Sequence, residues 1–109
     1  MSIDVADIAA KMLEAFKGQL TKKWPEVKVY AETEARKLAE TLVMIEKLKL
    51  AGEITDEQAK LQLQIQKNAC RTVFLAIEGL GIIAVEQAIN AALGVLKDAI
   101  NTALKFPLI

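Results

Sequence analysis

The sequence predicts an all-α fold, a helical hairpin or bundle that forms a single helical domain over residues 1–109. Three observations support this class. Hydrophobic residues make up 53% of the chain while glycine (5) and proline (2) are scarce, a composition that favours helix over sheet. Apolar side chains recur every three or four residues, which is the period of a helix with one buried face. Residues 52–58 combine a helix-ending glycine with a helix-starting cap.

The first helix is predicted over residues 3–23, with Ser2 as its cap. Proline disfavours α geometry at the residue that precedes it, so Trp24-Pro25 is expected to end this helix in a kink or tight turn. The apolar residues that define the buried face are Val5, Ile8, Met12, Phe16 and Leu20.

The second helix is predicted over residues 26–51, ending before Gly52, because glycine readily adopts the left-handed conformation that closes a helix. Thr55 and Gln58 then form a capping box, in which each side chain serves the backbone amide of the other residue. The segment therefore predicts an αα-hairpin, with a third helix beginning at Asp56.

We expect this third helix to run from residue 56 to residue 105. The polar residues keep one helical phase straight through Gly79-Leu80-Gly81, which favours a single helix that is bent at the glycines. Such a helix would be roughly 75 Å long at 1.5 Å per residue. The alternative is a break at Gly79 and Gly81, which gives an up-and-down bundle of four helices.

Charge is distributed unevenly along the chain. The 14 basic and 14 acidic residues cancel, and no basic cluster exceeds Lys22-Lys23, which argues against nucleic-acid binding. Of these 28 residues, 21 lie in residues 1–60, so the apolar segment 73–104 needs a cover. We expect copies of the chain to supply it, which predicts a homo-oligomer. Glu78 and Glu86 interrupt this segment and argue against a membrane span.

The absence of histidine removes most familiar catalytic chemistry. Imidazole is the usual general base near neutral pH, the partner of catalytic Ser or Cys, and the commonest metal ligand. We therefore predict no enzyme activity, no catalytic residue, no cofactor and no metal. Cys70, the single cysteine, is expected to be a small buried hydrophobe instead of a reactive thiol. The lone cysteine and the acidic N-terminal segment also predict a cytoplasmic protein.

Two sets of residues are candidates for function. Small side chains allow close helix approach, so a ladder in the C-terminal segment is a candidate association face, although alanine also favours helix formation by itself. Its residues are Ala84, Ala88, Ala91, Ala92, Leu96, Ala99, Ile100 and Ala103. Glu78 and Glu86 are candidates for buried carboxylates that bind an ion or a proton; the alternative is that they lie on a polar stripe in contact with water.

The leading functional hypothesis is a non-enzymatic, cytoplasmic assembly or scaffold protein that self-associates through its apolar C-terminal helix. A first alternative is a monomeric four-helix bundle that binds an apolar ligand or a partner helix between residues 73 and 104. A second alternative is a membrane-active helical hairpin.

Overall fold

The computed structural model describes residues 4–109, and this part of the chain is helical with no strands. The all-α class predicted from the sequence is therefore confirmed. In chain order the elements are α1 (Val5–Gln19), the short 3-10 helix η1 (Thr21–Lys23), α2 (Trp24–Leu50), α3 (Asp56–Leu75), α4 (Ile82–Gly94) and α5 (Lys97–Leu104).

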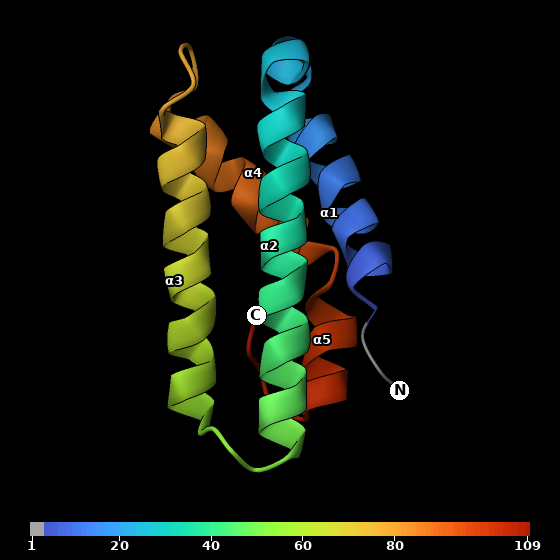
Figure 1. Ribbon diagram of the computed structural model, residues 1–109. Helices are drawn as coiled ribbons and strands as arrows, with labels where there is room; N and C mark the ends of the chain where they lie inside the picture. Colours follow the sequence, from blue (N-terminus) through green and yellow to red (C-terminus); the bar gives the residue numbers. More distant parts are fainter. Residues whose placement is uncertain (1–3) are drawn as a thin grey trace.

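Four of the helices pack in a closed ring. Helix α1 lies against α2, α2 against α3, α3 against α4, and α4 returns to α1. Figure 1 shows α2 and α3 side by side, with α4 crossing obliquely behind them and α5 beside the lower half of α2. The molecule measures 42 × 22 × 18 Å, so the helices form a short bundle.

The first helix is shorter than predicted. The side chain of Asp4 caps α1 by accepting a hydrogen bond from the Asp7 amide at 3.2 Å, whereas Ser2 lies outside the described residues. Helix α1 ends at Gln19, and the chain reverses through η1 instead of at Pro25. Pro25 lies in the first turn of α2, where its missing amide hydrogen costs nothing.

The hairpin between α2 and α3 has the predicted chemistry. Gly52 has a φ of +72°, the left-handed conformation expected of a residue that closes a helix. The Thr55 hydroxyl accepts from the Gln58 amide at 3.1 Å, and the Gln58 side chain accepts from the Thr55 amide at 2.9 Å. The predicted turn and the start of α3 at Asp56 are confirmed.

The prediction of one helix over residues 56–105 is wrong. The alternative break at the glycines is confirmed, but the segment after it forms two helices, α4 and α5, and not the single fourth helix of that alternative. Helix α3 ends at Leu75, Gly79 has a φ of +89°, and α4 begins at Ile82. A helix roughly 75 Å long would extend its second half far beyond α1 and α2. Folding at Gly79 brings α4 against α1 and α3, where its apolar side chains are buried within the same chain.

The core runs the length of the bundle. Near the end of the bundle where α1 and α3 finish, the Phe16 ring meets the Phe74 ring edge to face, with centroids 5.1 Å apart. The C-terminal segment closes the core, because Leu108 is buried and the Asn101 side chain bonds both the amide and the carbonyl of Ile109. The largest fully buried side chains also include Met12, Leu38, Leu42, Ile45, Ile89, Leu96 and Ile100.

Within residues 4–109, no helix combines the length and the apolar character that a membrane crossing requires. The most apolar helix, α4, is 13 residues long.

Candidate functional site

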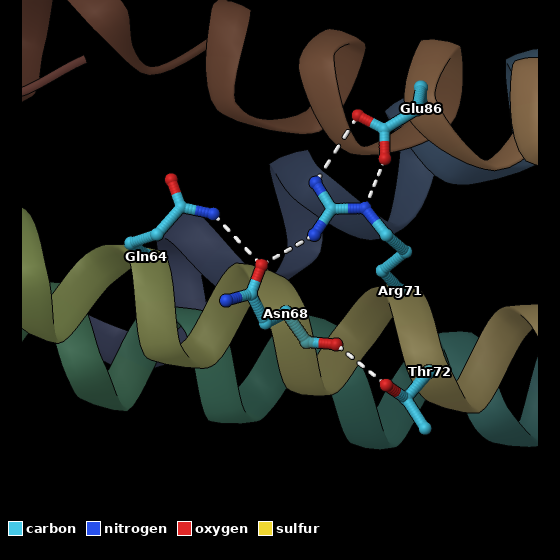
Figure 2. A network of polar contacts seen from close by, with 5 residues as sticks. All are labelled: Gln64, Asn68, Arg71, Thr72 and Glu86. Atoms are coloured by element: carbon cyan, nitrogen blue, oxygen red, sulfur yellow. Dashed lines mark hydrogen bonds and ion pairs between the residues drawn. The ribbon is translucent and has the colours of Figure 1, made fainter.

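The most extensive polar network joins α3 to α4 (Figure 2). The Arg71 guanidinium grips the Glu86 carboxylate with two hydrogen bonds, from Nε to Oε1 and from Nη2 to Oε2, the latter at 3.2 Å. Its Nη1 also donates to the Asn68 side-chain oxygen at 2.5 Å, and Gln64 donates to that same oxygen at 2.9 Å. These contacts order four side chains across the junction between two helices.

The ion pair between Arg71 and Glu86, here called the clamp, holds α3 and α4 together. The hydrogen bond from Arg71, and then its charge, lower the pKa of the Glu86 carboxyl below its ordinary value. The same hydrogen bond raises the pKa of Arg71. Both groups are therefore ionised near neutral pH. The Glu86 carboxylate, predicted from the sequence as a candidate ion or proton site, is instead paired with Arg71 of the same chain.

Neither of the two candidate carboxylates is buried. The side chain of Glu86 is 36% exposed, and Glu78 is exposed in the turn that separates α3 from α4. Their positions agree with the alternative that they contact water. The helix break explains the position of Glu78, because that residue follows the end of α3 and lies outside any helix.

The buried carboxylates are Glu34 and Glu46 of α2, and neither was predicted from the sequence to be buried. Glu34 is 2% exposed; its Oε2 lies 3.6 Å from the Lys37 ammonium, and its Oε1 is buried without a hydrogen bond. Glu46 is also buried. A signal for Glu34 was present in the sequence, since residue 34 falls between Ala31 and Leu38 at the spacing of the apolar stripe.

Cys70 is fully buried on α3 and close enough to Glu34 to sense its charge. Burial, reinforced by the negative charge of Glu34, raises the pKa of the thiol to about 12. The thiolate is the nucleophilic form, so this cysteine is inert near neutral pH. The expectation of a small buried hydrophobe is confirmed.

The candidate association face lies largely inside the molecule. Ala88, Ala92, Leu96 and Ile100 are at most 1% exposed, so in this fold they contact residues of their own chain. The small side chains of Ala88 and Ala92 allow α4 to approach α1 closely, whereas Ile100 is on α5, which packs against α2. Ala99 is exposed, and the partly buried members of the set are Ala84, Ala91 and Ala103.

The surface instead exposes large apolar side chains on α2, on α3 and around the ends of α4. On α3, Leu61 is 59% exposed and Ile65 is 55% exposed, and both point away from the core. The other large apolar residues exposed on the described part of the chain are Val29, Tyr30, Met44, Leu50, Leu75, Ile82, Ile83 and Val95. None of these residues was predicted from the sequence to be an interaction residue.

Open grooves also lie at both ends of the bundle. One of about 570 Å³ lies between the first turns of α2 and the end of α3, where Tyr30 faces Val73 and Ile77. Another, of about 610 Å³, lies where Leu50 at the end of α2 meets Ala99 and Ala103 of α5. Within the described residues no group of three or more His, Cys, Asp or Glu side chains is arranged to hold a metal ion.

Comparison with known proteins found no matching family model, no matching curated protein and no matching solved structure.

Proposed function

We propose that this chain is a non-enzymatic helical assembly protein that associates with copies of itself. The observation that carries the proposal is the exposure of large apolar side chains on a bundle whose core is already filled, above all Leu61 and Ile65 of α3. Exposed apolar surface of this kind commonly marks a protein interface.

The ionisable groups support a structural role over a catalytic one. Glu86 is held by Arg71, and the thiol of Cys70 is kept protonated by burial. A catalytic acid, base or nucleophile needs access to substrate and a pKa matched to its task. Glu86 and Cys70 instead have the environments of residues that stabilise the fold, the first through an ion pair and the second through burial in the core.

A copy of the same chain is the simplest partner, because the formal net charge is zero and two copies do not repel one another at long range. The surface used for association differs from the C-terminal ladder expected from the sequence, since most of that ladder is occupied by intramolecular packing.

Light scattering coupled to size exclusion tests the proposal. We expect the mass to rise with loading concentration from that of the 11.9 kDa chain toward twice that value or more. A constant monomer mass up to about 100 µM, a concentration at which even a weak specific dimer of micromolar affinity forms, would contradict self-association.

A further inference from the structure

Helix α3 carries a second apolar stripe on the face opposite its core. The stripe, here called the outer seam, consists of residues spaced alternately four and three apart: Leu61, Ile65, Asn68, Thr72 and Leu75. This is the a and d spacing of a two-stranded coiled coil. The residues that α3 buries within the bundle are on its other side, namely Ala59, Leu63, Cys70 and Phe74.

The outer seam is accessible along its whole length. Leu61, Ile65 and Leu75 are exposed large apolar residues, at 59%, 55% and 40%, and Asn68 and Thr72 are exposed between them. Figure 1 shows α3 at the edge of the bundle, with α2 on one side and no element of residues 4–109 on its outer side. A helix from another molecule can therefore reach the seam without displacing any of the described residues.

No charged residue lies on the seam, and one of its two flanks carries opposite charges on either side of Gln64. The positions that flank the a and d residues on one side are Glu57, Gln64 and Arg71, seven residues apart. If two such helices run antiparallel about a two-fold axis at Gln64, Glu57 of each copy lies opposite Arg71 of the other. The same alignment places Leu61 against the second copy's Ile65, so that apolar residues meet at the centre.

Arg71 can accept this additional carboxylate. A guanidinium has five N–H donors, and three of them are used by Glu86 and Asn68. The network also holds Asn68 in place, since Gln64 and Arg71 both donate to its side-chain oxygen (Figure 2). A fixed polar residue in a coiled-coil seam lowers stability but selects one register over others.

We propose that two copies of this chain pair antiparallel through the outer seams of α3, with Gln64 at the two-fold axis and Glu57 facing Arg71 at each end. This inference rests on the proposed self-association and names its surface and geometry. A parallel pair would instead bring the acidic first turns of both helices together, and it would leave Glu57 beside the uncharged Gln62.

The pairing is expected to be reversible. The overlap of residues 57–71 spans roughly 21 Å at 1.5 Å per residue, only about two heptads. Thr72 and Leu75, at the C-terminal end of the seam, lie outside this paired region. So short an overlap buries less surface than a standard interface of about 1,600 Å². We therefore expect a dissociation constant in the micromolar range.

The first test compares Ile65→Glu with the matched control Val29→Glu. Both replace an exposed β-branched residue on a helix surface, and Val29 is on α2, away from the seam. We expect Ile65→Glu to weaken dimerisation at least tenfold in light scattering or sedimentation, with helical circular dichroism retained, while Val29→Glu dimerises like the parent chain. If the parent chain associates and Ile65→Glu does not weaken it, the seam is refuted while self-association survives. If the parent chain is monomeric, self-association itself fails.

The second test determines orientation by disulfide trapping. In the antiparallel pair, residue 64 of one copy lies opposite residue 64 of the other. The Gln64→Cys variant should therefore form a cross-linked dimer under mild oxidation, whereas the Leu61→Cys variant should not. Cys70 stays unreactive as an internal control because it is fully buried. Cross-linking by Leu61→Cys but not by Gln64→Cys would show parallel helices and overturn the proposed geometry.

Discussion

Replacing Glu34 with methionine should stabilise the protein, although the change removes an ion pair. The Glu34 side chain is 2% exposed, and its Oε1 has no hydrogen bond. A buried acceptor without a partner costs about 1–3 kcal/mol. The compensating contact is the Lys37 ammonium, 3.6 Å from Oε2, on a side chain that is 53% exposed. A partly solvated pair of this kind contributes at most about 1 kcal/mol.

Methionine has nearly the length of glutamate and its flexible thioether fills irregular space, so the core should accept it. The net expectation is a gain of about 1–2 kcal/mol in the free energy of unfolding, in keeping with the replacement of other buried ionic groups by apolar ones. Lys37 remains solvated after the change, so no buried charge is left unpaired.

Urea denaturation followed by circular dichroism measures this gain. The matched control is Glu40→Met on the same helix, where the carboxylate is exposed and lies 3.8 Å from Arg36. We expect the control to change stability by less than about 0.5 kcal/mol. A second readout is the Cys70 thiol, whose pKa of about 12 should fall because the charge of Glu34 helps to raise it. A loss of stability in Glu34→Met, with Glu40→Met unchanged, would refute the reasoning and show that the buried carboxylate stabilises the fold.

Three further predictions concern the turn, the clamp and the packing of α4. Gly52→Val should lower the free energy of unfolding by about 1–2 kcal/mol, because a β-branched residue is strained at a φ of +72° even though an added Cβ meets no neighbour. Thermal melts measure this loss, and an unchanged melting temperature would contradict the left-handed cap. Glu86→Gln should make the free energy of unfolding depend less steeply on pH in the acid range. The folded pKa of Glu86 is lowered, so the Arg71 contact stabilises above the ordinary carboxyl pKa and is lost as pH falls through the folded value; an acid profile identical to the parent's would exclude the clamp. Ala88→Leu should reduce the free energy of unfolding by about 1–3 kcal/mol through overpacking, measured by denaturation in urea, whereas a neutral result would mean that Ala88 is not in the core.

The local features of the fold could be predicted because they depend on residues close in sequence. The turn at Gly52 and the capping box of Thr55 and Gln58 involve one left-handed residue and two side-chain contacts to nearby amides. The apolar spacing of the first 50 residues likewise identified buried positions such as Phe16 and Leu38. The inertness of Cys70 followed from the usual burial of an isolated cysteine.

The candidate site was harder to predict because burial depends on which helix covers a given face. The apolar segment after residue 72 requires a cover, but periodicity cannot say whether the same chain or another copy provides it. The structure uses α1 and α3 to cover α4, and this buries Ala88 and Ala92. The same assignment leaves Leu61 and Ile65 outside, so the surface available for association is on α3.

By itself, the sequence determined the helical class, the α2–α3 hairpin and the absence of histidine chemistry, because composition and short-range contacts act without reference to the rest of the chain. The tertiary structure decided where the C-terminal segment breaks and which acids are buried. The polar pattern continues with helical spacing through Gly79, but a continuous helix there would leave the apolar face of α4 exposed. Burying that face against α1 and α3 lowers the free energy by more than a continuous helix would. Glu34 is buried because the packing of α2 against α3 encloses its side chain beside Cys70. Both outcomes depend on contacts between residues far apart in sequence, whose free energy exceeds the local helical preferences that a single sequence reveals.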